Sequence, residues 1–392
     1  NNSIKINSIS LTDVQNENHA GSVYYAFSEY EYFVANVFVQ EFGSDGLPVS
    51  SPIRLVEDIM QDNIVKNISE IGDGDGLLVV FDSESWMGSS VQYVGVDYSG
   101  NILEGWEDVA DFSTFNSNQK FKGLVNMGEY GFFIIWEDDR GGSADVYGQK
   151  IDINGNLQGS IDGVPIAVEQ NDQTEPTITY NEQLNEIMVC WEDYRSGIYY
   201  DIYCNTVHGE TLELGNEIIV SELSYNQRYP YVYSSLDDSY LVTWQDSRND
   251  PGENLAPDDD IYIQHLLNGQ SQFQQDGIVV CDEDFSQTYP QIELYSEDSN
   301  SYMIYWNDNR SSGKEDLVNI YTQSITIQSN ECLSMDVNND GIINVIDIVL
   351  VVNIIFGDTI PDNQQSCASD ANGDGIINVL DVVLIVNYIL SF

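Results

Sequence analysis

The feature that most constrains this chain is a repeated trio of tryptophan, aspartate and arginine, spaced two residues apart. Each copy is followed by a segment such as Asp-Ile-Tyr. The four copies are Trp136, Asp138 and Arg140; Trp191, Asp193 and Arg195; Trp244, Asp246 and Arg248; and Trp306, Asp308 and Arg310. Two degenerate copies precede them, so the aromatic anchors fall at 27, 81, 136, 191, 244 and 306. A period of this length with several short strands per copy is typical of radial or linear repetition.

The clearest copy predicts four strands, at 176–180, 186–191, 200–204 and 217–220. Four strands in each of six copies favour an all-β six-bladed β-propeller over residues 1–330, followed by a small α module over 331–392. The second strand is continuously apolar, as expected when neighbouring blades cover both of its faces. The sixth copy lacks a fourth strand. We expect the alternating segment 3–11 to supply it and to close the ring.

The recurring tryptophan, aspartate and arginine have two interpretations. They could form a ring of ligand-binding arginines, or they could serve each blade structurally. A residue repeated in every blade is most simply explained by something that every blade needs. We therefore expect the tryptophan to fill the space between blades, and the aspartate and arginine to tie the hairpin through charge-assisted hydrogen bonds. Of six arginines, this leaves only Arg54 and Arg228 for other roles.

The charge of the chain limits its partners. Twelve basic residues stand against 65 acidic residues, which gives a net charge of −53. Such a charge argues against binding nucleic acid or an anionic membrane. No apolar run reaches the length of a membrane span. The chain begins at Asn1 without a charged and apolar leader, and we interpret this as a mature secreted protein.

A duplicated unit near the C-terminus predicts two calcium loops. Each copy places oxygen ligands at positions 1, 3, 5, 9 and 12 of a twelve-residue loop, a glycine at position 6 and a backbone carbonyl at position 7. The first set is Asp336, Asn338, Asp340, Ile342 (carbonyl), Asn344 and Asp347, and the second is Asp370, Asn372, Asp374, Ile376 (carbonyl), Asn378 and Asp381. Each loop leads into an apolar helix, and we expect no helix before either loop. Two Ca²⁺ ions are therefore predicted.

These paired loops resemble the type I dockerin, the calcium module by which secreted bacterial proteins attach to a cohesin partner. The resemblance covers about 335–392. It implies that positions 10 and 11 of each loop face the partner, and these are Val345, Ile346, Val379 and Leu380. In many dockerins those positions are small or hydroxylated, so the apolar residues here leave two partners open: a cohesin-like scaffold or an identical subunit.

Three smaller features add candidate sites. Cys332 and Cys367 precede the two loops at near-equivalent places, which favours a disulfide that closes the module. Cys190 and Cys204 flank one hairpin and are a second candidate pair. The fifth copy carries an acidic insert at 250–260, which is either a third calcium site or a solvated loop.

The function that we expect from the sequence is a secreted, non-catalytic structural protein. In this hypothesis the propeller is a rigid block, the calcium module docks onto a neighbouring subunit or scaffold, and the product is an extracellular filament or ring. The three histidines fall in no motif, and neither a nucleophile elbow nor a zinc signature is present. The alternatives are a dockerin-bearing polysaccharide-active enzyme, such as a glycoside hydrolase or lyase, and a carbohydrate-binding propeller. The fold alone does not decide among them.

Overall fold

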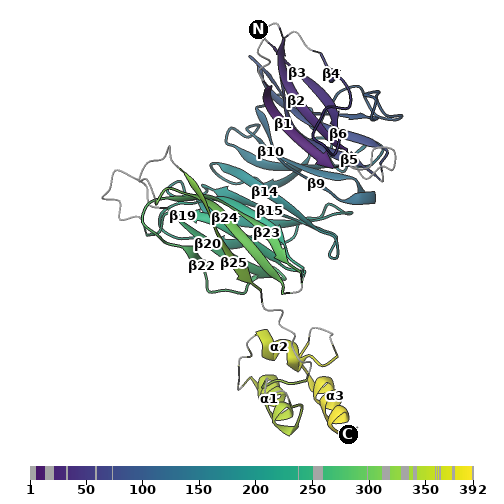
Figure 1. Ribbon diagram of the computed structural model, residues 1–392. Helices are drawn as coiled ribbons and strands as arrows, with labels where there is room; N and C mark the ends of the chain where they lie inside the picture. The colour runs from purple at the N-terminus through teal and green to yellow at the C-terminus, as the bar shows by residue number, and fades with distance from the viewer. Residues whose placement is uncertain are drawn as a thin grey trace. The chain divides into compact units, whose positions relative to one another are not determined.

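The chain forms a large β unit and a small helical unit. The computed structural model describes all residues except 1–5, 14–21, 32–33, 58–59, 73, 237, 250–258, 298, 311–317, 328–334, 339–341, 358, 360, 362, 373–375 and 391–392. The first compact unit spans 1–325 and the second spans 326–392 (Figure 1). Strands dominate the first unit and helices the second, which confirms the predicted mostly β fold with a small C-terminal helical part.

The described residues of the β unit form six antiparallel sheets. The first contains β1 (Ile6–Asp13), β2 (Val23–Glu31), β3 (Val34–Phe42) and β4 (Ile53–Val56), and the second β5 (Asp62–Ile71), β6 (Gly76–Ser85), β7 (Gly88–Val96) and β8 (Ala110–Asp111). The third contains β9 (Gln119–Asn126), β10 (Phe132–Asp138), β11 (Asp145–Ile151), β12 (Leu157–Gln158) and β13 (Val164–Ala167), with the 3-10 turn η1 (Gly128–Tyr130) between β9 and β10. The fourth contains β14 (Gln173–Asn181), β15 (Glu186–Asp193), β16 (Asp201–His208) and β17 (Ile218–Ser221). The fifth contains β18 (Gln227–Ser234), β19 (Tyr240–Asp246), β20 (Asp260–Leu267), β21 (Gln270–Ser271) and β22 (Ile278–Cys281), and the sixth β23 (Gln287–Ser296), β24 (Ser301–Asp308) and β25 (Asn319–Thr326).

The core lies between consecutive sheets. From the second sheet onward, the first strand packs across the preceding sheet, as β14 does on β9, β10 and β11. The second strands are covered on both faces, and every residue of β10 and β19 is buried. Along β10, Phe132 and Trp136 pack toward the second sheet, whereas Phe133 and Ile135 pack toward the fourth. The continuous apolar pattern of these strands is explained by this two-sided burial.

The predicted closure by residues 3–11 is wrong. In the structure β1 pairs with β2, so it is the first strand of the first sheet. The described part of the sixth sheet consists of three strands, β23, β24 and β25. The first sheet already has four strands of its own, so its N-terminal strand serves that sheet rather than the last one.

Each Trp-x-Asp-x-Arg segment builds the same hairpin end. The indole Nε1 donates a hydrogen bond to the aspartate at 2.8 to 3.1 Å in the four copies. The arginine backbone N–H donates to the same carboxylate at 2.8 to 2.9 Å, and the guanidinium forms an ion pair with it. The guanidinium carbon also lies 3.8 to 4.4 Å from the ring centroid of a tyrosine on the third strand. The three residues therefore serve the hairpin, as the structural interpretation expected.

A second carboxylate lies directly across from the aspartate in three of these hairpins. The pairs are Asp138 with Asp145, Asp193 with Asp201, and Asp246 with Asp260. Asp145 and Asp201 are buried, and one oxygen of each accepts no hydrogen bond from the described residues. Burial is the largest cause of a raised pKa in both, to about 6 for Asp145 and about 7 for Asp201. Each of these two hairpins thus holds one paired carboxylate and one that is costly to ionise.

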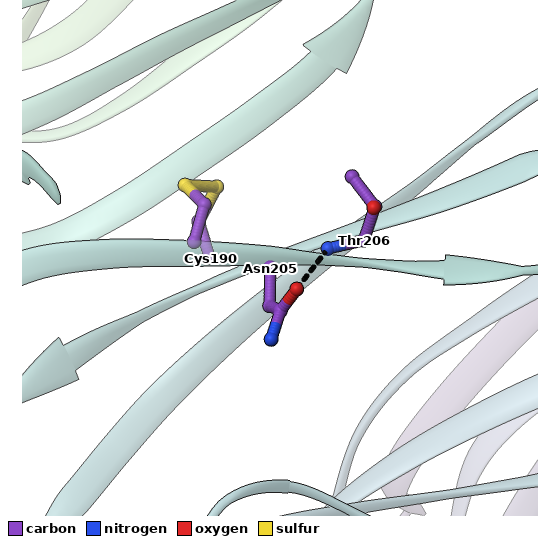
Figure 2. Close-up of a disulfide and its surroundings, with 4 residues drawn as sticks. Cys190, Asn205 and Thr206 are labelled. Carbon is purple, nitrogen blue, oxygen red and sulfur yellow. Dashed lines mark hydrogen bonds between the residues drawn. A yellow bond between two sulfur atoms is a disulfide. The ribbon is translucent and has the colours of Figure 1, made fainter. Parts of the chain in front are cut away.

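One predicted disulfide is confirmed. Cys190 and Cys204 are paired residues of β15 and β16, and they are joined by a disulfide with a Cα–Cα distance of 4.0 Å. Figure 2 shows this bond beside Asn205, whose Oδ1 accepts the backbone N–H of Thr206 at 2.8 Å. The bridge links the two central strands of the fourth sheet.

The other cysteines lie in different surroundings. Cys367 is also disulfide-bonded, whereas Cys332 lies outside the described residues. Cys281 is a free, buried thiol. Arg310 donates a hydrogen bond to its Sγ at 2.9 Å, and burial raises the pKa of the thiol. The predicted pairing of Cys332 with Cys367 stays a prediction.

In the described part of the second unit the helices are α1 (Val345–Phe356), α2 (Asn363–Ser369) and α3 (Val379–Leu390). The two longer helices pack against each other over a small buried core. The helix α2 precedes the second calcium loop, so the expectation of no preceding helix is wrong for that loop. Within the described residues, no helix is long and apolar enough to cross a membrane.

The hairpin ion pairs provide a stability test. In the variant Asp193→Ala, Arg195 and the Trp191 indole lose their shared acceptor. We expect the free energy of unfolding to fall by about 3 kcal/mol or more, measured by urea denaturation. The control is Arg54→Ala, which removes a surface pair with Glu57 and should cost less than about 1 kcal/mol. Equal losses in the two variants would contradict this role.

The raised pKa of Asp201 predicts a pH dependence. The unfolded chain releases this proton near its ordinary pKa of 3.8, whereas the folded chain holds it to about 7. Stability therefore falls progressively as the pH rises between these values, because only the unfolded chain gains the free energy of ionising this carboxyl group. We expect Asp201→Asn, which copies Asn319 of the last repeat, to raise the midpoint of thermal unfolding at about pH 8 and to change it little near pH 4. The same shift at both pH values would contradict this prediction.

Candidate functional site

Buried carboxylates mark the first candidate site, in the two loops of the helical unit. The side chains of Asp336, Asp347 and Asp381 are 1%, 0% and 0% exposed. Asp347 accepts the backbone N–H groups of Asn338 and Asn344 at 3.2 and 2.8 Å. In the second loop, Asp381 accepts those of Asn372 and Asn378 at the same two distances. The two loops therefore share one local structure, as their duplication predicts.

Each loop also joins its ligand positions to the following helix. Asn344 is the N-cap of α1, because its Oδ1 accepts the backbone N–H of Ile346 at 2.8 Å. Its Nδ2 donates to the carbonyl of Ile342 at 3.0 Å. Asn378 and Ile376 make the matching contact at 2.9 Å. Positions 7, 9 and 12 of each loop are thus held together at the start of a helix.

The residues of this unit fit a divalent cation. Residues 326–392 contain no lysine, arginine or histidine that could neutralise the buried carboxylates. Buried carboxylates without a counter-charge are costly, and carboxylate, amide and carbonyl oxygens are the ligands that Ca²⁺ prefers. The fifth-position ligands Asp340 and Asp374 lie outside the described residues. Within the described residues, no three His, Cys, Asp or Glu side chains gather around one point.

Apolar side chains next to the loops are exposed in matching pairs. Val345 and Ile346 are 64% and 56% exposed, and Val379 and Leu380 are 66% and 57% exposed. Such paired apolar patches are typical of surfaces that contact another protein.

The second candidate site involves the first strands of the fourth, fifth and sixth sheets, each of which contains a β-bulge. The bulge residues are Glu175, Tyr229 and Tyr289, with φ of 47°, 51° and 54°, and a proline follows each. A left-handed backbone is unfavourable for residues other than glycine and is often found at functional sites. The bulge also turns one side chain out of the regular alternation of the strand.

A carboxylate from the preceding sheet holds the bulge in three places. This carboxylate belongs to the residue that follows the aromatic anchor, and it accepts a hydrogen bond from the backbone N–H of a bulge residue. Asp82 accepts from Phe121 at 3.0 Å, Glu137 from Glu175 at 2.7 Å, and Glu192 from Tyr229 at 2.7 Å. Each carboxylate also pairs with a cation: Lys66, Lys122 and Arg228, at 3.1, 3.1 and 3.0 Å. Despite these cations, burial raises the pKa of Asp82 and of Glu192. This contact thus recurs between consecutive sheets, and we call each such place, where the residue after an aromatic anchor meets the bulge of the next sheet, a junction.

The junction differs between the fifth and sixth sheets, because Gln245 takes the place of the carboxylate. Its Nε2 donates to Oδ2 of Asp259 at 2.8 Å. Its Oε1 is buried and accepts no hydrogen bond from the described residues. Asp259 is 7% exposed and also accepts a hydrogen bond from the hydroxyl of Ser247. An amide and a buried carboxylate thus replace the paired carboxylate found at Asp82, Glu137 and Glu192.

A cavity of about 720 Å³ opens at this altered junction. It is lined by Gln245, Asp259, Arg228 and the two bulge tyrosines, Tyr229 and Tyr289. The tyrosine ring centroids are 4.6 Å apart, and Tyr289 is 52% exposed. Burial, together with a hydrogen bond to Tyr289, raises the pKa of Tyr229 to about 12, so its phenol stays neutral. Convergent polar groups beside aromatic rings are typical of ligand sites.

The sequence interpretation missed this site, although a signal was present. Gln-x-Tyr-Pro occurs at 227–230 and 287–290, and Gln-x-Glu-Pro at 173–176, always at the start of a first strand. The predicted calcium insert at 250–260 lies largely outside the described residues, at 250–258. Asp260 accepts a hydrogen bond from Asn249 at 2.7 Å, and the third calcium site stays a prediction.

Comparison with known families identifies the helical unit. Residues 334–390 match the type I dockerin domain. The resemblance drawn from the duplicated loops is therefore confirmed for this part of the chain. A search of curated proteins finds no match.

Solved structures similar to this chain include a Dyadobacter fermentans protein of unknown function, with 11% identity, 84% and 96% of the two chains covered and a TM-score of 0.45. They also include an α-L-arabinanase from Penicillium chrysogenum, with 11% identity, and an α-L-arabinofuranosidase from Fusarium graminearum, with 10% identity. Each of these two alignments covers 82% of this chain and 93% of the other chain, with a TM-score of 0.44.

These neighbours correct the function expected from the sequence. Several of them are glycoside hydrolases, which contradicts the expectation of a non-catalytic structural protein that forms filaments. The sequence interpretation went wrong because the repeated aspartates and arginines made the carboxylates of the β unit look uniformly structural.

Proposed function

We propose that this chain is a secreted, dockerin-bearing glycoside hydrolase. In this proposal the β unit acts on a polysaccharide and the helical unit attaches it to a protein partner outside the cell. The observation that carries the proposal is the dockerin match over two loops that bury the carboxylates of Asp347 and Asp381. Dockerin domains bind cohesin partners and are typical of extracellular, cellulosome-associated proteins, which supports both the partner and the location.

Two calcium ions, one in each loop, complete the helical unit in this proposal. The ligands are the six positions of each loop given above, with Asp347 and Asp381 at the twelfth position. When bound, the ion supplies the positive charge that the buried carboxylates require. The chain itself orients the ligands, since Asn344 and Asn378 tie each loop to its helix.

The partner surface is the pair of exposed apolar patches, Val345 with Ile346 and Val379 with Leu380. Its apolar character favours a cohesin-like protein with an apolar face rather than one that offers hydroxyl partners. The two patches occupy equivalent positions in the duplication, so each presents a similar surface.

The proposed catalytic part is the β unit, with its six sheets arranged as a six-bladed propeller and the cavity between the fifth and sixth sheets as the active site. Hydrolysis of a glycosidic bond commonly uses two carboxyl groups. Asp259 lines the cavity and is buried, and we propose it as one of them. Its contacts with Gln245 and Ser247 hold the carboxylate in one orientation.

We expect each of the two loops to bind one calcium ion. Isothermal titration of the calcium-free chain should give two ions per chain. The variants Asp347→Ala and Asp381→Ala should each remove one, because each deletes a buried twelfth-position ligand. Glu297→Gln, at an exposed carboxylate in the β unit, is the control. Two ions retained in either loop variant would contradict the assignment of ligands.

Hydrolytic activity is expected to depend on Asp259. Release of reducing sugar from a panel of plant polysaccharides should be measured for the native chain and for Asp259→Asn. A lost acid or base group typically lowers the rate by about 100-fold or more. The control Asp282→Asn changes an exposed carboxylate and should keep full activity. A native chain that releases no sugar from any polysaccharide would refute the proposed enzyme.

A further inference from the structure

The hairpin end of the second sheet, between β6 and β7, departs from the repeat. Strand pairing aligns it with the hairpin of the third sheet, because the anchor Phe81 pairs with Gln92 as Trp136 pairs with Tyr147. Serines then stand where the third sheet has charged residues. The equivalent positions are Ser83 for Asp138, Ser85 for Arg140 and Ser90 for Asp145. Three hydroxyl groups therefore replace the ion pair of the Trp-x-Asp-x-Arg hairpins.

A cavity of about 320 Å³ opens at this hairpin end. The three serines and Gln92 all line it, so it lies at the positions that an arginine and a tyrosine fill in the third sheet. Phe115 also lines it, and the guanidinium carbon of Arg140 lies 4.4 Å from the centroid of that ring. Pockets that hold small ligands have volumes from roughly 300 Å³ upward. The missing ion pair thus leaves room for a ligand.

The polar groups of this cavity are within reach of a ligand. The hydroxyl of Ser83 donates to the amide oxygen of Gln61, and the amide of Gln92 donates to Asp111 at 2.9 Å. Within the described residues, no hydrogen bond is made by the amide nitrogen of Gln61, the hydroxyl of Ser90 or the amide oxygen of Gln92. These residues are half-buried, and each of the three atoms keeps some accessible surface. A ligand therefore meets both donors and acceptors that it can contact.

The charges around the cavity favour a neutral ligand. Asp111 is the charged residue among the described lining residues, and its carboxylate already accepts a hydrogen bond from Gln92. These lining residues include no lysine, arginine or histidine that could pair with an anion. The net charge of −53 repels polyanions as well. Neutral amide and hydroxyl groups suit a ligand whose own hydroxyl groups both donate and accept.

An exposed apolar surface adjoins the cavity at the turn of the hairpin. Trp86 and Met87 form the two-residue turn between β6 and β7. Trp86 is 86% exposed, whereas the other five tryptophans of the chain are at most 8% exposed. Met87 and Phe115, which line the cavity, are 66% and 49% exposed. Such a group of exposed apolar side chains is typical of a binding surface.

From these contacts we propose that the hairpin end of the second sheet binds a neutral polysaccharide, at a site separate from the cavity of Asp259. One sugar residue enters the cavity and exchanges hydrogen bonds with its amide and hydroxyl groups. A neighbouring sugar packs its C–H face on the indole of Trp86. A protein partner would instead favour an apolar centre.

This inference goes beyond the proposed function. Hydrolysis commonly uses two carboxyl groups, whereas Asp111 is the one carboxylate among the described residues that line this cavity. The site therefore holds the polysaccharide and does not cleave it.

Affinity electrophoresis of the full chain loaded with calcium, in native gels that contain arabinan, xylan or polygalacturonate, tests this site. We expect at least one neutral polysaccharide to retard the chain, and polygalacturonate not to retard it. Trp86→Ala removes the indole and should raise Kd by roughly tenfold. The double variant Ser83→Asp with Ser85→Arg fills the cavity with the charged pair of the third sheet, and it should also bind about tenfold more weakly.

The matched control is Ile198→Ala, which changes an exposed apolar residue at the hairpin end of the fourth sheet. It should bind as the native chain does, and thermal unfolding verifies that all variants fold. The inference is overturned if a neutral polysaccharide retards the native chain and both variants equally, or if it retards none of them. Self-association that Trp86→Ala abolishes, without binding to polysaccharide, would identify a protein contact and overturn the inference too.

Release of reducing sugar separates this inference from the proposed function. A native chain that binds polysaccharide through Trp86 but releases no sugar would refute the proposed enzyme alone. A native chain that releases sugar, but whose binding does not depend on Trp86, would refute this inference alone.

Discussion

The β unit depends on one repeated contact, in which a buried carboxylate of one sheet accepts the N–H of a bulge residue in the next. Asp82, Glu137 and Glu192 make this contact, and each carries its own cation. The contact compensates the unfavourable left-handed backbone of the bulges at Glu175 and Tyr229, and it satisfies their N–H groups at the edge of a sheet. The Trp-x-Asp-x-Arg hairpins stabilise each sheet, but these carboxylates connect one sheet to the next.

The contact changes at two places along the chain. The hydroxyl of Ser28 accepts the N–H of Val65 between the first and second sheets, and Gln245 stands at the position between the fifth and sixth. Where Gln245 replaces the carboxylate, its amide donates a hydrogen bond to Asp259, and a cavity opens beside two tyrosines. Departures from a local structural rule tend to mark functional sites, because only there does the departure bring a benefit. The helical unit follows a similar principle, since its buried carboxylates become favourable only with a bound cation.

Several features were predictable from sequence because their causes are local. The hairpins, the calcium loops and the Cys190–Cys204 disulfide follow from residue spacing. The partner of a strand does not follow from residue spacing. The alternating pattern of residues 6–13 fitted closure of the last sheet equally well, but in the structure these residues pair with β2. The helix α2 was missed because its polar sequence has no apolar period. The cavity was missed because its tyrosines are far apart in sequence and meet only through two bulges.

The most direct measurement of this account is a crystal structure of the native chain with an oligosaccharide that it hydrolyses or binds. The account predicts a sugar ring in the cavity between the fifth and sixth sheets, with a glycosidic oxygen beside the carboxylate of Asp259. A sugar bound elsewhere on the β unit, with this cavity unchanged, would contradict the proposal that the cavity is the active site.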